Sequence, residues 1–266
     1  MHELLETAER AARLGGEVLR SWAGRFTSRE KSPANLVTEA DLASERAIYE
    51  FIRERFPDHR FLGEEGLNQD AGDSPVRWII DPLDGTSNYV HGFPYYAVSI
   101  GVEYQRALVA GAIYDPSRDE MFLAAAGDGA TLNGQPIHVS LRDDLSTALC
   151  MASLPVKTTR DHPAVQSFLR VLEAAQHVQR TGSAALNLAA VAAGRVEAFW
   201  STSLKSWDMA AGVVLVREAG GTVTRTAGGP FVIDDPDLLA SNGTRLHNGL
   251  SELLNPPTGG NANRHP

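Results

Sequence analysis

An apolar run at residues 78–80 leads directly into two aspartates, Asp81 and Asp84, which lie on either side of Pro82 and Leu83. The run predicts a buried strand, and Pro82 disfavours a helix at Asp81, so the acids lie on a tight turn at the strand end. That turn can bring both carboxylates and the Leu83 carbonyl oxygen together. Because buried charges of one sign repel each other, such a cluster needs a cation. The segment therefore predicts a strand that ends at a metal site.

The residues after Asp84 suit an anion. Gly85, Thr86 and Ser87 offer backbone N–H groups at the expected start of a helix, where an anion is favoured. The oxygen ligands before them suit Mg²⁺, which keeps coordination positions for water and for a substrate phosphate. An ordinary Asx-type turn would explain the same residues, since Asp-Pro and Asp-Gly pairs are frequent turn formers. On this segment alone, both interpretations remain open.

Further acids occur at two other places. Glu64 and Glu65 follow a short apolar segment, residues 61–63. Adjacent carboxylates repel unless a cation lies beside them, so one could bind a metal while the other accepts a proton from a bound water. A solvated loop is the alternative. Asp208 opens a helix predicted over residues 208–219, and the role of N-cap would explain it equally well.

Other motifs either have a structural explanation or are absent. The Thr38–Asp41 segment predicts a capping box, in which Asp41 reaches back to the Thr38 N–H. The eight histidines show neither His-x-x-x-His nor His-x-His spacing, which argues against a zinc site. The chain has no Gly-x-Ser-x-Gly elbow and no P-loop, which argues against the common serine hydrolases and nucleotide-binding loops. The acidic residues therefore carry the chemistry.

Hydrophobic spacing predicts helices at about residues 4–22 and 38–56 and antiparallel strands between residues 95 and 139. From residue 149 to residue 254, strands and helices alternate, which implies a layered α/β arrangement. The fold class is therefore mixed, α+β in the first half and α/β in the second.

We expect two lobes that share one compact body. Residues 1–142 form an N-terminal lobe with most of the metal ligands, and residues 143–254 form a C-terminal lobe with the last ligand and the substrate side. Residues 255–266 are rich in Pro, Gly and Asn and predict a disordered tail.

Charge and cysteine content limit the partners and the compartment. A net charge of −9 argues against nucleic acid as a main partner, because phosphate backbones select basic surfaces. The single cysteine, Cys150, cannot form an intrachain disulfide, which fits a reducing cytoplasm. The first residues lack the pattern of a signal peptide, and the apolar stretch at residues 209–216 is too short to span a bilayer. We therefore expect a soluble cytoplasmic protein without a membrane partner.

Taken together and in this order, three acidic motifs resemble those of the inositol monophosphatase family. They are Gly63-Glu64-Glu65, the segment at residues 78–88, and Trp207-Asp208 with its following Ala-Ala-Gly. Phe93-Pro94 with residues 97–101, the segment at residues 182–187 and the segment at residues 218–221 add to the resemblance, which runs from about residue 31 to residue 242.

The resemblance implies a magnesium-dependent, lithium-sensitive phosphomonoesterase of layered αβαβα fold that works as a homodimer with two or three Mg²⁺ ions per site. A first ion would be held by Glu64, Asp81, the Leu83 carbonyl oxygen and Asp84. A second would be held by Asp81, Asp84 and Asp208, and Asp41 with Glu64 would help to place a third.

The resemblance also implies roles around the phosphate. Glu65 and Thr86 would position and deprotonate the attacking water. The phosphate oxygens would meet Gly85, Thr86 and Ser87, and the substrate side would include Gly182, Ser183 and Ala184. Two metal ions can clamp the attacking and leaving oxygens of an in-line displacement.

One position departs from the family pattern. Where the animal enzymes carry a glutamate that binds sugar hydroxyls, this chain has Ser201, and Lys205 adds a cation nearby. The change puts a strict preference for inositol in doubt and admits a second negative group on the substrate. An exposed loop lysine is the alternative explanation of Lys205.

The leading hypothesis is hydrolysis of myo-inositol 1-phosphate. The same chemistry on fructose 1,6-bisphosphate, on NADP or another nucleotide phosphate, or on histidinol phosphate is the nearest alternative. From a different class comes a regulatory role in binding RNA polymerase or RNA, which the family also implies for some bacterial members.

Overall fold

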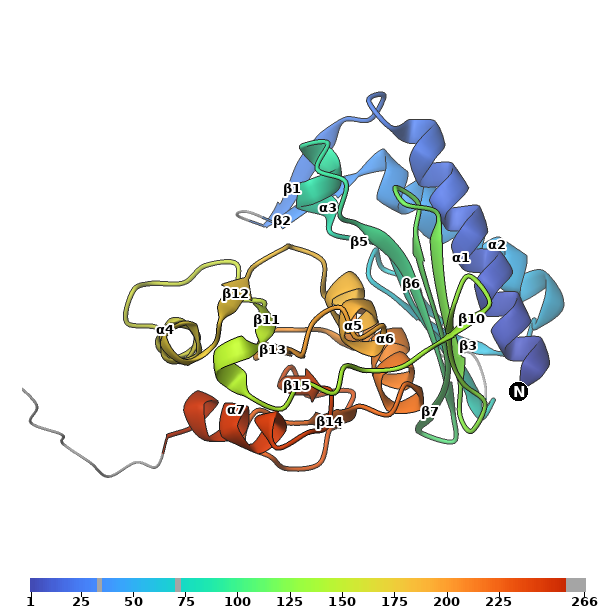
Figure 1. The fold of residues 1–266 in the computed structure, drawn as a ribbon. Helices are drawn as coiled ribbons and strands as arrows, with labels where there is room; N and C mark the ends of the chain where they lie inside the picture. The colour runs from blue at the N-terminus through green and yellow to red at the C-terminus, as the bar shows by residue number, and fades with distance from the viewer. Residues whose placement is uncertain (33–34, 70–72, 257–266) are drawn as a thin grey trace, which may run out of the picture.

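The protein, described here from a computed structural model, consists of two large β-sheets, a two-stranded sheet and seven α-helices in the described residues, which are 1–32, 35–69 and 73–256. Helices α1 and α2 cover one face of the larger sheet, α5 and α6 lie between the two sheets, and α4 and α7 lie beyond the smaller sheet (Figure 1). The layers therefore follow the order αβαβα, as the resemblance implied.

The first half of the chain forms the larger sheet and its outer helices. The sheet has eight strands in the order β10-β9-β8-β7-β6-β5-β3-β4 and is antiparallel except where β3 pairs with β5. The helices are α1 His2–Trp22, α2 Glu39–Arg55 and α3 Thr86–Val90, and the strands of this sheet are β3 Arg60–Gly63, β4 Asn68–Gln69, β5 Val76–Asp84, β6 Ala97–Tyr104, β7 Ala107–Asp115, β8 Glu120–Ala125, β9 Gly129–Leu132 and β10 Gln135–Ile137. A separate hairpin joins β1 Ser28–Ser32 to β2 Asn35–Thr38.

The second half forms a five-stranded mixed sheet in the order β12-β11-β13-β15-β14. A short 3-10 turn at Leu145–Thr147 precedes it. Its elements are β11 Leu149–Ala152, α4 Pro163–Ala174, β12 His177–Gln179, α5 Ala184–Ala192, β13 Ala198–Ser201, α6 Ser206–Glu218, β14 Thr222–Thr224, β15 Leu238–Ser241 and α7 Leu246–Leu254.

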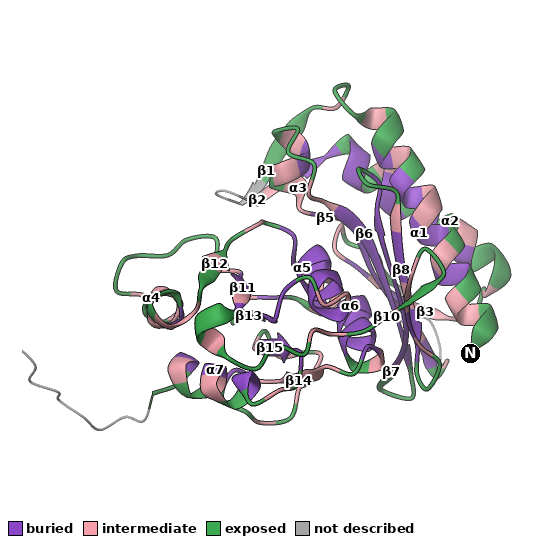
Figure 2. Cartoon of the chain, in the orientation of Figure 1, coloured by how far each residue is buried: buried purple, intermediate pink, exposed green. Residues whose placement is uncertain are grey.

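The most deeply buried layer is the one between the sheets. Every residue of α5 is buried, and so are the residues of α6 from Met209 to Val216 (Figure 2). A helix that is apolar on all sides is buried on all sides, which is why the two helices form the central layer. None of the helices in the described part of the chain has the length and apolar character needed to cross a membrane.

Two glycines let α6 approach the larger sheet closely. Gly101 on β6 faces Ala210, and a Cβ atom at Gly101 would overlap the Ala210 side chain. Gly111 pairs with Gly101 on the neighbouring strand, and a Cβ atom there would lie 2.5 Å from the Ala211 carbonyl oxygen. The helix therefore rests directly on the strand backbones, and this contact sets its height above the sheet.

Most predicted elements are confirmed, with small shifts at their ends. The expected helix at residues 38–56 is α2, and Thr38 and Asp41 form the predicted capping box. The helix predicted from Asp208 begins two residues earlier, at Ser206.

The sequence analysis did not name β1, β2, β4 or β12. Three of these four strands have only two to four residues, and β1 is a polar five-residue segment, so none has a clear hydrophobic pattern. Of the predicted tail, only Asn255 and Pro256 belong to the described residues.

Candidate active site

Strand β5 delivers Asp81 and Asp84 to the edge of the cleft between the sheets. The strand is buried from Trp78 to Asp84, and its pairing with β6 shifts register between the two aspartates. The Leu83 N–H donates to Asp81 Oδ1 at 3.0 Å, and Ser44 on α2 donates to the Pro82 carbonyl oxygen at 3.0 Å. These bonds hold the predicted tight turn in place.

Asp208 approaches the same point from α6. The helix begins at Ser206, so Asp208 is its third residue and Lys205 is the N-cap. The Asp208 carboxylate accepts the Lys205 N–H at 2.7 Å. Oxygen atoms of Asp81, Asp84 and Asp208 all lie within 4.8 Å of one another. The structure thus joins three carboxylates that are up to 127 positions apart in the sequence.

The environment makes these three carboxylates hard to ionise. Burial, followed by the charge of Glu64, raises the pKa of Asp81 well above its usual value. Burial raises the pKa of Asp84 only to about 6, since Ser183 and the backbone N–H of Ala185 donate to its carboxylate. Burial and the charge of Asp84 raise the pKa of Asp208 to about 8.

The donor set fits a divalent metal ion. Three buried carboxylates that repel each other would be relieved by a cation, and a set of oxygen ligands suits Mg²⁺ among the common metals. The residues present therefore fit the metal that the sequence predicts.

Glu64 and Glu65 lie directly after β3, beside the cluster. The Glu64 N–H donates to the Ile80 carbonyl oxygen at 3.2 Å, which holds the segment next to the end of β5. Glu64 is not one of the three clustered carboxylates, but its charge raises the pKa of each of them. The Glu65 N–H donates to Glu45 Oε1 at 2.9 Å, so a buried acid of α2 positions this loop.

Thr86 connects Asp41 to the turn. Its hydroxyl lies 3.3 Å from Asp41 Oδ1 and 3.2 Å from the Leu83 carbonyl oxygen. The other carboxylate oxygen of Asp41 accepts the Thr38 N–H and hydroxyl at 2.8 and 2.5 Å. Asp41 thus has a capping role and also contacts Thr86, so the two explanations of this residue are compatible.

The second half of the chain closes the site through α5 and the segment before it, which contacts α3 of the first half. Ser183 is the N-cap of α5, and it donates to Asp84 together with the first turn of that helix. Asn88 on α3 donates to the carbonyl oxygens of Tyr95 and Thr181 at 2.7 and 2.8 Å. Gly182, at a φ of 91°, packs against the Asn88 amide, which a side chain there would displace. Both halves of the chain therefore contribute to one rigid wall.

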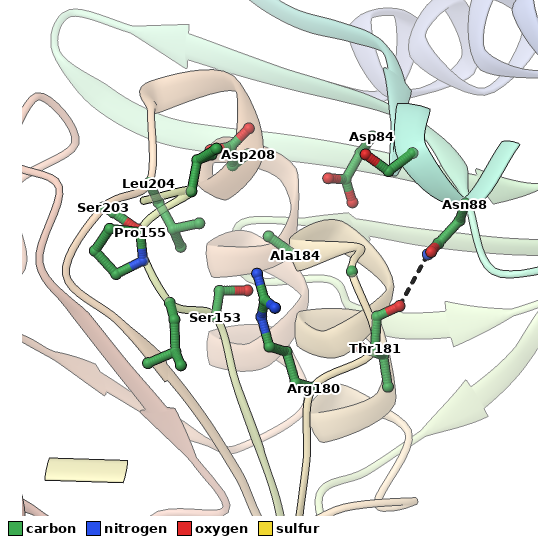
Figure 3. A pocket seen from close by; sticks show the side chains of 14 residues that line it. Asp84, Asn88, Ser153, Pro155, Arg180, Thr181, Ala184, Ser203, Leu204 and Asp208 are labelled. Carbon is green, nitrogen blue, oxygen red and sulfur yellow. Dashed lines mark hydrogen bonds between the residues drawn. The ribbon is translucent and has the colours of Figure 1, made fainter. Parts of the chain in front are cut away.

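A cavity of about 590 Å³ opens beside the carboxylates. In Figure 3 the Arg180 guanidinium lies inside it, near Ser153 and Ala184, with Asp84 and Asp208 farther along the wall. The lining residues are Asp84, Ser87, Asn88, Ser153, Leu154, Pro155, Val156, Arg180, Thr181, Gly182, Ala184, Ser203, Leu204 and Asp208.

The structure brings only some of the predicted substrate-side residues to this cavity. Ser87, Gly182 and Ala184 line it, and Ser183 is buried behind them, on Asp84. Gly85 and Thr86 form the adjacent start of α3. Ser201 is buried at the end of β13, and Lys205 is exposed before α6, so neither lines the cavity. Their roles beside the leaving group therefore stay a prediction.

The sequence analysis missed Arg180, Ser153, Ser203 and Asn88 at this cavity, and Glu45 behind it. Arg180 lies two residues before the segment at residues 182–187, which is part of the family resemblance. That position was the one indication in the sequence that Arg180 could reach the site. Ser203 is the hydroxyl that faces the cavity from the segment where Ser201 was expected to act, and its N–H donates to the Ser201 hydroxyl at 3.3 Å.

Comparisons with known proteins agree with this geometry. The chain matches the model of the inositol monophosphatase family over residues 1–256. It is 41% identical over 244 residues to an inositol-1-monophosphatase of Synechocystis, covering 90% of this chain and 84% of that protein. It is 39% identical over 245 residues to the Nus factor SuhB of Pasteurella multocida, covering 91% and 92% of the two chains.

Among solved structures, the extragenic suppressor protein suhB from Bartonella henselae has a TM-score of 0.91 and 36% identity, covering 96% of this chain and 99% of that chain. The matched residues include both sheets and all three clustered carboxylates.

Proposed function

The chain belongs to the inositol monophosphatase family and is a phosphatase, and we propose that it hydrolyses myo-inositol 1-phosphate to myo-inositol and inorganic phosphate with Mg²⁺. The observation that carries the proposal is the cluster of Asp81, Asp84 and Asp208, two of which, Asp84 and Asp208, line a cavity of about 590 Å³. A cavity of this size suits a small phosphate ester.

Asp81, Asp84 and Asp208 would hold the metal ions, with Glu64 and the Leu83 carbonyl oxygen completing the ligand set. When bound, Mg²⁺ would offset the charge of the phosphate dianion and lower the pKa of the attacking water. Support comes from the raised pKa of each clustered aspartate, which indicates a need for positive charge at this point.

The protein's own groups would then manage the proton and the phosphate. We assign Glu65 and Thr86 to orient the attacking water, and Asp41 to accept a hydrogen bond from the Thr86 hydroxyl, as it does at 3.3 Å in this structure. The water oxygen bonds to phosphorus as the bond from phosphorus to the alcohol oxygen breaks. The N–H groups of Gly85 and Thr86 would bind phosphate oxygens, since the first N–H groups of a helix have no partner within it.

The alcohol would lie against the far wall of the cavity. Hydroxyls of Ser153 and Ser203 and the guanidinium of Arg180 face this space, and they suit a leaving group that carries several hydroxyls. Arg180 would also suit a second phosphate on the substrate. Fructose 1,6-bisphosphate, NADP and histidinol phosphate are therefore retained as alternative substrates.

A substrate panel tests the proposal. We expect kcat/KM with Mg²⁺ to be highest for inositol 1-phosphate when it is measured beside fructose 1,6-bisphosphate, NADP and histidinol phosphate. A preference for one of the other esters would replace the substrate but leave the site intact. Absence of phosphate release from every ester would overturn the proposal.

A second function is suggested by the relatives named SuhB, one of them a Nus factor. Those names point to a regulatory role connected with transcription, and the net charge of −9 disfavours direct RNA contact as its basis. An Asp81→Asn variant separates the two functions, because a regulatory role would persist in a catalytically silent protein. In cells that lack this protein, failure of the Asp81→Asn variant to restore the normal phenotype would argue for the enzyme alone.

Two further expectations concern the state of the protein. We infer a homodimer from the family resemblance, and sedimentation of the purified chain tests it directly. The single thiol, Cys150, is buried and free, which is compatible with a reducing compartment such as the cytoplasm.

A further inference from the structure

A second cavity, of about 500 Å³, lies away from the acidic cluster, where the start of β5 and the end of β6 meet the last turn of α6. The segment at residues 231–234 forms its other side. The lining residues are Arg60, Arg77, Glu103, Arg106, Ala107, Leu108, Arg217, Phe231, Val232, Ile233 and Asp234.

The wall of this cavity is basic, although the whole chain is acidic. Four arginines face two carboxylates there, while the chain has a net charge of −9. Arg77 pairs with the buried Glu103 at 2.9 Å and lies 4.0 Å from Asp234. The Arg77 Nε atom is buried and has no hydrogen-bond partner among the described residues. A buried donor without an acceptor costs free energy, so it is the pair with Glu103 that holds the Arg77 guanidinium in the wall.

Two other arginines supply charge that no carboxylate of the described residues offsets. Arg217, in the last turn of α6, lies over the Phe231 ring at 5.6 Å, and Arg106 lies in the turn between β6 and β7. Arg106 and Arg217 are both exposed, so their guanidinium groups are accessible to an anion in the cavity. Elsewhere, the exposed Arg195 pairs with a carboxylate, at 2.6 Å to Glu120.

The cavity also has an apolar side. Phe231, Leu108 and Val232 face it next to the arginines. A ring stacked on Phe231 and a charged group among the guanidinium groups would both find a matching surface. The volume is that of a site for a small metabolite.

We propose that this cavity is a second anion site, which binds a small phosphorylated molecule with its phosphate groups among Arg77, Arg106 and Arg217 and its planar part against Phe231. The site is distinct from the catalytic one. Arg77 precedes Asp81 by four residues of extended strand, about 13 Å, and Arg217 and Asp208 lie near opposite ends of α6. At 1.5 Å per residue, Arg217 and Asp208 are about 14 Å apart along the helix axis.

The loop that forms the cavity also touches the beginning of α6. The Ser206 hydroxyl donates to the Ile233 carbonyl oxygen at 3.2 Å, and Ser206 precedes Asp208 by two residues. A ligand that binds Arg77 would compete with Asp234 for this side chain. The cavity is therefore in physical contact with an element that carries one of the clustered aspartates.

Binding of ADP measured by calorimetry in EDTA tests the site. Without metal, the acidic cluster repels phosphate groups, so any binding observed reports on another site. We expect one ADP per chain for the unmodified protein, about tenfold weaker binding for Arg217→Gln, and about twofold to fivefold tighter binding for Asp234→Asn, which removes a negative group from the wall.

Arg53→Gln is the matched control, because it removes one exposed positive charge on α2, at a residue that does not line the cavity. Thermal denaturation of each variant first establishes that it is folded at the temperature of the binding measurement. Arg77 is left unchanged, since its loss would leave Glu103 buried and unpaired. Absence of ADP binding by the unmodified protein, or binding that Arg217→Gln weakens no more than Arg53→Gln does, would overturn the proposal.

Discussion

Two buried carboxylates lie near β5 in opposite electrostatic settings: Asp81 is on the second half of the strand, and Glu103 is on β6 beside the start of β5. Asp81 is 1% exposed and faces Asp84 and Asp208. Glu103 is 3% exposed and faces the Arg77 guanidinium at 2.9 Å. Both side chains are buried, but Asp81 faces other carboxylates and Glu103 faces a guanidinium group.

This difference separates buried acids that are neutralised within the fold from buried acids that need a bound cation. Glu103, like Asp115 with Arg118 and Glu197 with Arg142, has an arginine partner in the fold itself. Asp81 has hydrogen bonds and other carboxylates, and no ion pair to it is found in the described part of the chain. A buried acid without a cation needs a ligand that supplies one.

The largest effect should come from removing the metal. We expect EDTA to abolish phosphatase activity and Mg²⁺ to restore it, because the three aspartates then have no cation with which to hold the phosphate. Released phosphate is the readout, and circular dichroism shows whether the fold persists. Activity that survives complete chelation would contradict the metal-site interpretation of the end of β5.

The Asp81→Asn variant should lose nearly as much. We expect turnover to fall by about 10³-fold or more, since the cluster loses a ligand to the metal. In EDTA, the variant should be at least as stable as the unmodified protein, because a neutral amide relieves repulsion with Asp84 and Asp208. If Asp81→Asn instead unfolds the chain, the segment is a structural turn.

Glu103→Gln is the matched change at the other end of the strand. It leaves Arg77 buried with a neutral partner, so we expect a loss of about 3 kcal/mol in the free energy of unfolding. Below the unfolding transition, kcat should stay within about twofold of the unmodified value, since Glu103 lies outside the acidic site. Chemical denaturation and steady-state kinetics measure the two effects. Equal damage to kcat by Glu103→Gln and Asp81→Asn would remove the distinction between the two ends.

The pH dependence of stability should distinguish the ends without a change in fold. The pKa of Asp84 is raised to about 6 and that of Asp208 to about 8, above the ordinary value of 3.8. Between these values the folded, metal-free chain binds more protons than the unfolded chain, so its stability falls as the pH rises from about 4 to about 8. The fall should be several kcal/mol, because one pKa unit corresponds to about 1.4 kcal/mol.

Denaturation in EDTA at pH 5 and pH 8 measures this fall. Asp208→Asn should flatten it, since one of the titrating groups is removed. A metal-free protein that gains stability over the same range would show that the cluster is not repulsive.

The smallest effect concerns the substrate side. Arg180→Gln should raise KM for fructose 1,6-bisphosphate about threefold to tenfold and change KM for inositol 1-phosphate less, because a second phosphate is the group that Arg180 would bind. Lys205→Gln is the control, because Lys205 is exposed and does not line the cavity. The reverse result would support the original assignment of Lys205 to the leaving-group side.

Local patterns in the sequence were enough to predict part of this site. The apolar strand, Pro82 and the glycine turn give Asp81 and Asp84 a common position through covalent geometry alone. The capping role of Asp41 was likewise predicted from a local pattern, whereas its place in the site came from the family resemblance. Asp208 required the family resemblance, since nothing within α6 indicates that its first turn meets β5.

Other parts of the site depend on contacts between distant segments. Ser183 donates to Asp84 across 99 positions, and Asn88 bonds to Thr181 across 93. Arg180 is in an irregular segment whose direction is set by those contacts, so its presence in the cavity could not be predicted from spacing. The sequence favoured Ser201 and Lys205 by counting from Trp207, but a count along the chain does not give the direction of a side chain.

The contact of α6 with Gly101 and Gly111 has a consequence for how this sequence can diverge. Any larger residue at either glycine must displace the helix, since Ala210 and Ala211 are already small and the contact at Gly111 involves the backbone of Ala211. Displacing the helix would also displace Asp208. Substitution at two positions that touch neither metal nor substrate is therefore restricted by the geometry of the acidic cluster. The active site constrains residues that pack beneath α6 as well as those that bind the metal.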